Sequence, residues 1–87
     1  MIELNDIQIQ ILRSLTFPET FDTLLEEVRA TQPVIGAELK QLMVLGLVQV
    51  MEEDERGRFK MSIIYDSDNM RAFQYQISSK GLIYVEG

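Results

Sequence analysis

The spacing of hydrophobic residues changes near residue 47, and this change divides the chain into two halves. Before residue 47, apolar residues recur every three or four positions, which is the period of an amphipathic helix. After it, apolar and polar residues alternate, which is typical of strands that bury one face. We therefore expect one α+β domain over residues 1–87, with helices first and antiparallel strands after them.

Three helices are predicted, over about residues 5–16, 21–29 and 31–45. The first begins at Asn5, a favourable N-cap, and Gln8 stands three positions later, as in a capping box. Pro18 ends this helix, because the residue before a proline avoids the α region. Either Thr20 or Asp22 can cap the second helix, which runs for only about two turns.

The third helix has a clear beginning and a clear end in the sequence. Thr31 is expected to cap it, and Pro33 falls in its first turn, where a missing amide proton costs little. Gly46 supplies the left-handed residue that follows the helix, and Leu47 is expected to pack back on the last turn. This is the pattern of a Schellman motif.

Three strands are predicted, over about residues 47–54, 58–65 and 71–78, and they form an antiparallel hairpin or meander. Residues 66–69 between the last two have the composition of a turn. The odd-numbered residues from Phe59 to Tyr65 are all apolar, so we expect them to share one buried face. We interpret the aromatic side chains of these strands as core packing rather than as a surface for stacking bases: Phe59, Tyr65, Phe73 and Tyr75.

The composition narrows the possible chemistry. There is no Cys, His or Trp, so the chain offers no disulfide, no thiolate or imidazole ligand for a metal, and no Ser-His-Asp or Cys-His nucleophile. Nothing in the sequence gives a carboxylate pair the cleft that acid–base catalysis needs, and no cofactor is indicated. We therefore expect a protein that is not an enzyme.

Two acidic segments, residues 52–55 and 66–69, are interpreted as solvated turns. Sites for hard cations need oxygen ligands that converge from a shaped loop, and neither segment has that pattern. No purely apolar run exceeds four residues, and Glu3 and Asp6 interrupt the start of the chain. Neither a membrane span nor a signal peptide is predicted, so we expect a cytoplasmic protein.

The order of the predicted elements resembles a winged helix-turn-helix domain. Residues 46–48 (Gly-Leu-Val) resemble the segment that leads the recognition helix of that family into its sheet. Residues 73–81 resemble the family's returning strand and its closing Lys-Gly. The resemblance covers about residues 5–81, nearly the whole chain.

This resemblance implies a three-helix winged helix-turn-helix fold with a C-terminal antiparallel hairpin. In that fold the third helix enters the major groove of DNA, and the hairpin, or wing, contacts the backbone or the minor groove. Residues 48–73 are more numerous than a two-stranded wing requires, so an extended wing is expected. Only six residues follow Gly81, so we do not expect the C-terminal dimerisation helix that is common in the family.

The resemblance selects candidate DNA-binding residues on two elements. On the third helix, the residues placed at base edges are Gln32, Val34, Gly36, Ala37, Lys40 and Gln41. On the wing, the candidates for phosphate contact are Arg56, Arg58 and Lys60. The alternative for the wing residues, which we favour, is that they keep the outer face of an edge strand soluble.

The charge opposes DNA binding on the helices. The formal net charge is −6, and residues 19–46 carry five acidic side chains and two basic ones. Residues 56–80 carry five basic side chains and two acidic ones, but the adjacent acidic residues 52–55 weaken their field. Because phosphate neutralisation supplies most non-specific DNA affinity, the helical half is a poor surface for it.

Two functions therefore remain open. The leading interpretation is a DNA-binding, transcriptional-regulator-like protein, which the resemblance supports. The other is a winged-helix module whose partner is another protein, which the acidic helices favour. Acidic mimicry of nucleic acid is a third interpretation.

The C-terminal run predicts a homodimer interface that consists of Leu82, Ile83, Tyr84 and Val85. The run is apolar, β-prone and too short to fold alone, so it is expected to pack on its own sheet or to pair with a second copy. Met51 and Ile64 are expected to extend the same apolar surface.

Overall fold

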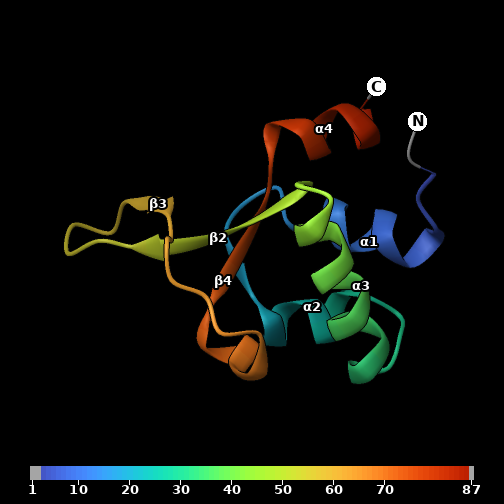
Figure 1. Ribbon diagram of the computed structural model, residues 1–87, viewed down its shortest axis with the longest axis horizontal. Coiled ribbons are helices and arrows are strands. Elements are labelled where there is room, and N and C mark those ends of the chain that lie inside the picture. The colour runs from blue at the N-terminus through green and yellow to red at the C-terminus, as the bar shows by residue number, and fades with distance from the viewer. Residues whose placement is uncertain (1–2, 87) are drawn as a thin grey trace.

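The computed structural model describes residues 3–86, with the helices α1 to α3 in the first half and most of the sheet in the second (Figure 1). The elements are α1 (Asp6–Ser14), β1 (Glu19–Thr20), α2 (Phe21–Glu27), α3 (Gln32–Val44), β2 (Val48–Glu53), β3 (Phe59–Met61), the 3-10 helix η1 (Ser67–Ala72), β4 (Gln74–Ile77) and α4 (Ser79–Glu86). The predicted α+β class is therefore confirmed. Within residues 3–86, no helix is long and apolar enough to cross a membrane.

The four strands form one antiparallel sheet in the order β1-β4-β2-β3. In its centre, Val48 lies opposite Ile77 and Val50 lies opposite Tyr75, and all four side chains are buried. Strand β1 was not predicted, because a strand of two residues leaves no alternation to detect. Strand β3 pairs with β2 alone and forms an outer edge.

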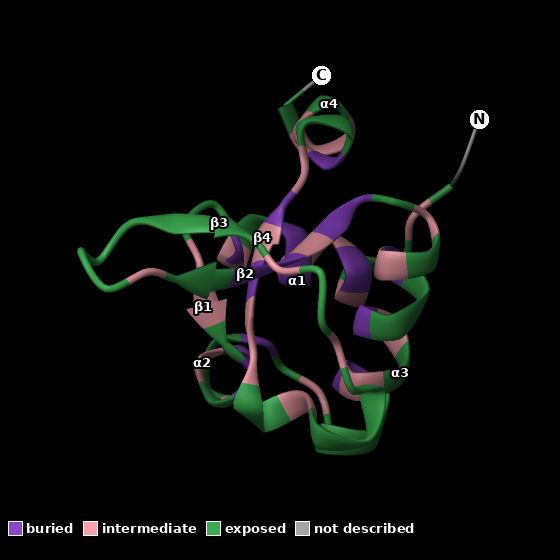
Figure 2. Cartoon of the chain, turned by 60° about the vertical axis from the view of Figure 1, so that its left-hand side comes forward, coloured by how far each residue is buried: buried purple, intermediate pink, exposed green. Residues whose placement is uncertain are grey.

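The core lies between this sheet and the helices α1, α2 and α3 (Figure 2). The helices bury apolar residues spaced three or four positions apart, as the sequence pattern predicts, and the fully buried ones are Ile11, Leu12, Leu15, Leu24, Ile35, Leu39 and Leu42. The hairpin formed by β2, β3 and residues 54–58 projects from this core, and its tip is exposed (Figure 2).

The starts of the first two helices have side-chain caps. The amide of Gln8 donates to Oδ1 of Asn5 at 2.8 Å, and the amide of Asn5 donates to Oε1 of Gln8 at 3.0 Å, which completes the predicted capping box. Thr20, not Asp22, caps α2. Each cap satisfies an amide that would otherwise lack a partner in the first turn of its helix.

The ends of α3 lie where the sequence predicts them. Thr31 occupies the N-cap position, although its side chain makes no capping hydrogen bond. After the helix, Gly46 has a φ of 75°, and the amide of Leu47 donates to the Leu42 carbonyl at 2.9 Å, as a Schellman motif requires.

The predicted strand over residues 58–65 is wrong beyond residue 61. The Ser62 hydroxyl donates to the Ile64 carbonyl at 2.8 Å and accepts from the Ile64 amide, and such local bonds compete with strand pairing. The turn expected over residues 66–69 opens the 3-10 helix η1, because Oδ1 of Asp66 accepts from the amide of Asp68. The strand predicted over residues 71–78 therefore begins only at Gln74.

The expectation of a β-prone C-terminus is also wrong, since residues 79–86 form the helix α4. The Ser78 hydroxyl accepts a hydrogen bond from the Gly81 amide at 3.0 Å, as an N-cap residue does, and this contact begins the helix. Leu82, Tyr84 and Val85 pack half-buried against the core, whereas Ile83 is 70% exposed.

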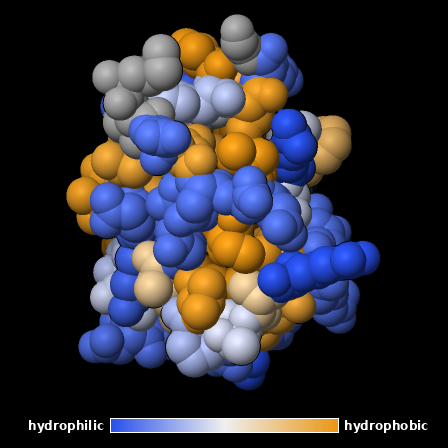
Figure 3. Space-filling view, turned by 90° about the vertical axis from the view of Figure 1, so that its right-hand side faces the viewer, coloured by the Kyte–Doolittle hydropathy of each residue, from blue (hydrophilic) through white to orange (hydrophobic). Residues whose placement is uncertain are grey.

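Figure 3 shows the side on which α1 and α3 lie, where hydrophilic side chains interrupt the exposed hydrophobic ones.

Candidate functional site

The outer side of α3 presents most of the residues predicted to contact bases. Val34, Ala37, Lys40 and Gln41 are exposed there, and Val44, which was not selected from the sequence, is 81% exposed. Lys40 is the one basic residue of this helix. The exposed surface of α3 is therefore largely uncharged, and it offers one cation to a phosphate.

The 3-10 helix η1 lies beside the first half of α3 and engages two of the predicted residues. A Cβ atom placed on Gly36 would lie 3.6 Å from Sδ of Met70, and Gly36 is half-buried. The Arg71 guanidinium donates to Oε1 of Gln32 at 3.3 Å and pairs with Asp22 at 3.2 Å. Gln32 thus makes a hydrogen bond within the chain, and Gly36 lies near Met70 of η1; the spacing of these residues on the helix gave no sign of either.

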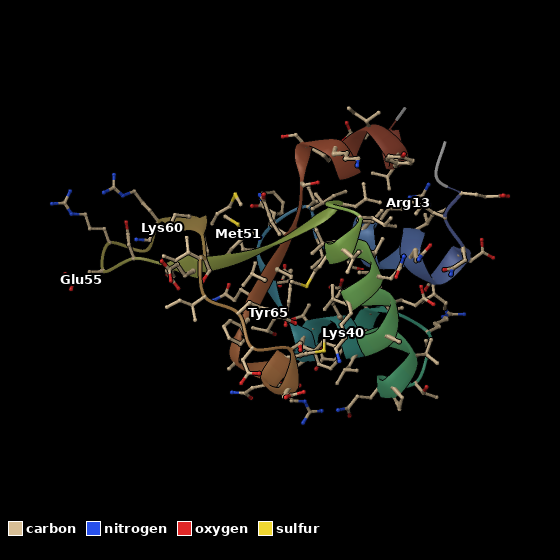
Figure 4. The ribbon with its side chains drawn as sticks, viewed as in Figure 1. Arg13, Lys40, Met51, Glu55, Lys60 and Tyr65 are labelled. Atoms are coloured by element: carbon tan, nitrogen blue, oxygen red, sulfur yellow. The ribbon has the colours of Figure 1, made fainter. Side chains whose placement is uncertain are left out.

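A groove of about 580 Å³ separates α3 from η1. Its lining includes Phe21, Gln32, Gly36, Lys40, Met70 and Arg71. A second hollow of about 400 Å³ continues along α3, where Lys40, Val44 and Tyr65 form part of its wall. Figure 4 labels Lys40 and Tyr65, which both line this hollow.

A cluster of aromatic side chains holds η1 in place. The buried Tyr75 hydroxyl donates to the Met70 carbonyl at 2.8 Å and lies 3.3 Å from the Tyr65 hydroxyl. The ring of Tyr65 packs 4.9 Å from that of Phe73. Burial raises the pKa of Tyr75 above its ordinary value of 10.0, and burial also raises the pKa of Tyr65. The core-packing interpretation is therefore confirmed for Tyr75, and Tyr65 and Phe73 pack beside it.

Two of the three basic residues predicted on the wing are paired with carboxylates of the same hairpin. Arg58 pairs with Asp54 and Lys60 pairs with Glu52, each at 3.4 Å. The backbone amides of Arg58 and Arg56 also donate to Asp54 and lower the pKa of its carboxyl. These contacts place the cations beside negative charges and leave the Arg56 side chain exposed at the tip.

The same hairpin exposes large apolar side chains, which contradicts the prediction that they face the core. Phe59 is 40% exposed, Met61 62% and Ile63 97%. Glu53 lies opposite Phe59 on β2, so this end of the hairpin extends beyond the core. The sequence gives one indication of this exposure: the acidic residues 52–55, which are expected to be solvated, lie next to β3 along the chain.

No site for a metal ion is formed by the acidic segments. Within residues 3–86, no three side chains of the types His, Cys, Asp and Glu come together in a way that can hold a metal. The carboxylates of Glu52 and Asp54 are used by the hairpin cations, and Asp66 begins η1. Three acidic side chains of the two segments thus make local contacts, Glu52 and Asp54 in ion pairs and Asp66 at the start of η1.

Comparison of the chain with protein-family models, with curated proteins and with solved structures finds no significant match.

Proposed function

We propose that this chain is a winged-helix interaction module whose principal target is protein rather than DNA. The order of its elements supports the winged-helix assignment, since α2 and α3 are joined by residues 28–31 and the β2–β3 hairpin projects from the sheet (Figure 1). One observation carries the choice of target. The hairpin exposes Phe59 and Met61, and the chain just after it exposes Ile63, while Arg58 and Lys60 of the hairpin are paired with carboxylates of the same hairpin.

Ion pairing matters because DNA affinity depends on cations that release counterions from phosphates. Exposed ion pairs are worth about 1 kcal/mol or less, so a phosphate can displace Glu52 from Lys60 at small cost. The displaced carboxylate nevertheless stays next to the phosphate and repels it. The hairpin therefore gains little from a DNA backbone, whereas its apolar side chains gain from contact with a protein.

DNA binding is the second candidate function. It is favoured by Lys40 and Gln41, which are exposed on α3, and by Arg56, which is exposed at the tip of the hairpin. In this alternative α3 meets base edges, and the chain acts as a regulator-like DNA-binding protein.

A DNA titration separates the two candidates. Fluorescence anisotropy of a labelled mixed-sequence duplex would be measured at about 50 mM and about 200 mM salt, because even a sequence-specific reader binds non-specific DNA at low salt. We expect no saturable binding for the wild-type chain at either salt concentration. Lys40→Glu serves as the matched variant: binding by the wild type that this variant loses, with a steep salt dependence, would establish DNA as the target.

A further inference from the structure

The groove between α3 and η1 and the hollow that continues it form one recess along the exposed side of α3. Lys40 and Ser67 line both parts, so the two parts adjoin at these residues. The recess extends from Gln32, at the beginning of α3, to Val44, at its end. This stretch of helix is about 18 Å long, a length that about five or six residues of an extended chain span. We call this surface the α3 recess.

The two parts of the α3 recess differ in chemistry. Beyond Lys40 the wall is formed largely by apolar side chains, those of Met43, Val44 and Tyr65, and Val44 is 81% exposed. Before Lys40 the polar side chains of Gln32 and Arg71 form part of the wall, and they are hydrogen-bonded to each other at 3.3 Å. The recess thus offers apolar contact to one end of a bound segment and polar contact to the other.

Lys40 supplies an uncompensated positive charge where the two parts adjoin. Among the residues that the structure describes, no carboxylate forms an ion pair with it. Glu38, the acidic residue of α3, accepts a hydrogen bond from the Asn5 side chain at 3.3 Å and so faces α1 instead. The other cation of the recess, Arg71, is paired with Asp22 at 3.2 Å. Lys40 is therefore the group that favours a negative charge on a bound segment.

The acidic residue of the recess limits where that negative charge can lie. Asp68 lines the groove before Lys40 but not the hollow beyond it. A carboxylate placed deep in the groove would meet Asp68, whereas a carboxylate at the junction meets Lys40 with the apolar wall beside it. The favoured ligand thus has an acidic group directly next to an apolar one.

We propose that the α3 recess binds a short extended segment of another protein in which an acidic residue adjoins a large apolar residue. The carboxylate pairs with Lys40, and the apolar side chain covers Val44 and Tyr65. A DNA phosphate can pair with Lys40 too, but it has no apolar group for the hollow, and Asp22 and Asp68 repel the phosphates beside it. This inference rests on the proposed protein-binding function and adds a second surface to the hairpin.

Peptide display tests the chemistry of the ligand. A library of random peptides of about seven residues, which is long enough to span the recess, would be selected on the immobilised wild-type chain. We expect the enriched peptides to share Asp or Glu next to a large apolar residue. A synthetic copy of one enriched peptide, and a second copy in which the acidic residue is replaced by its amide, then serve as labelled probes.

Fluorescence polarisation with these probes tests the location. Lys40→Glu should weaken binding of the acidic probe by about tenfold or more, because it replaces an attraction with a repulsion. Val44→Asp should weaken it similarly, since it places a carboxylate in the apolar hollow. Arg56→Glu is the matched control: it makes the same change of charge at the exposed tip of the hairpin and should leave the affinity unchanged. All three residues are exposed, so circular dichroism should show a wild-type fold for each variant.

The inference fails if selection enriches no peptide, if the enriched peptides lack the acidic residue, or if Arg56→Glu weakens binding as much as Lys40→Glu does. Equal binding of the acidic probe and its amide copy would also contradict the role of Lys40. If neither peptides nor DNA bind, the proposed protein-binding function remains, with the hairpin alone as its surface. Binding of a mixed-sequence DNA duplex that Lys40→Glu removes would instead overturn the proposed function itself.

Discussion

Replacing Gly81 with alanine should destabilise the protein, although alanine is the better helix former. Gly81 lies buried in the first turn of α4. A Cβ atom on this residue would lie 2.7 Å from Cγ1 of Ile77 and closer still to the carbonyl oxygen of Leu47. That oxygen accepts a hydrogen bond from the Ser78 amide at 2.9 Å, so it is held in place. The added methyl group must therefore push α4 away from the sheet.

The magnitude follows from two opposing effects. Helix propensity favours alanine over glycine by about 1 kcal/mol. Overpacking a close contact costs about 1–3 kcal/mol, and the upper part of this range applies because the obstacle is backbone rather than a flexible side chain. Displacement of α4 also weakens the packing of Leu82 and Val85 on the core. We expect a net loss of about 1–2 kcal/mol in the free energy of unfolding.

The assay is urea and thermal unfolding followed by circular dichroism. In a domain of this size, 1 kcal/mol shifts the melting temperature by about 4–8 °C. Gly36→Ala is the matched control, because the nearest side-chain atom, Sδ of Met70, would lie at an ordinary contact distance of 3.6 Å from the new Cβ. The free energy of unfolding of Gly36→Ala should rise by up to about 1 kcal/mol. The reasoning is refuted if Gly81→Ala proves as stable as the wild type or gains stability together with Gly36→Ala.

Three further predictions concern the polar contacts that hold the fold together. Tyr75→Phe removes the hydroxyl that donates to the Met70 carbonyl, so we expect the free energy of unfolding to fall by about 1–2 kcal/mol. The amides of η1 should then exchange faster, and unchanged amide exchange there would contradict this role of Tyr75. Because burial raises the pKa of Tyr75 and of Tyr65, the unfolded chain releases protons above about pH 10 that the folded chain retains. Stability should therefore fall as pH rises beyond that point, and the fall should be smaller in Tyr75→Phe, as urea titrations at successive pH values will show. Asn5→Ala breaks the capping box with Gln8, so we expect the free energy of unfolding, measured by thermal melting, to fall by about 1 kcal/mol. An unchanged stability would mean that water replaces the cap.

The helical half could be predicted closely because its signals are local. The capping box at Asn5 and the left-handed Gly46 each involve residues within a few positions of one another, and the structure contains both. The period of the apolar stripe also identified the buried residues of α3, since a helix has only one face to bury.

The second half depends on contacts that the sequence does not display. Tyr75 fixes η1 from a strand that follows it, through a hydrogen bond to the Met70 carbonyl. The contact between Arg71 and Gln32 joins residues 39 positions apart, so no spacing rule anticipates that η1 covers part of α3. Residues 82–85 have high β-propensity, but docking of α4 against the core makes them helical, as tertiary packing commonly does.

The exposure of Phe59, Met61 and Ile63, which were expected to be buried, has a different cause, and this cause also bears on function. An alternating pattern indicates that one face of a strand is buried, but it does not indicate whether the same chain or another chain covers that face. Phe59, Met61 and Ile63 follow the same alternation as a core strand, yet β3 is the outer strand of the sheet, and Phe59 and Met61 pair with Glu53 and Met51 rather than with the core residues Val48 and Val50. A strand that served only as a solvated wing has no physical need for this pattern, because polar residues would pair with β2 equally well. Burial of these side chains against a protein partner would explain the alternation, and this is the function proposed above for the hairpin.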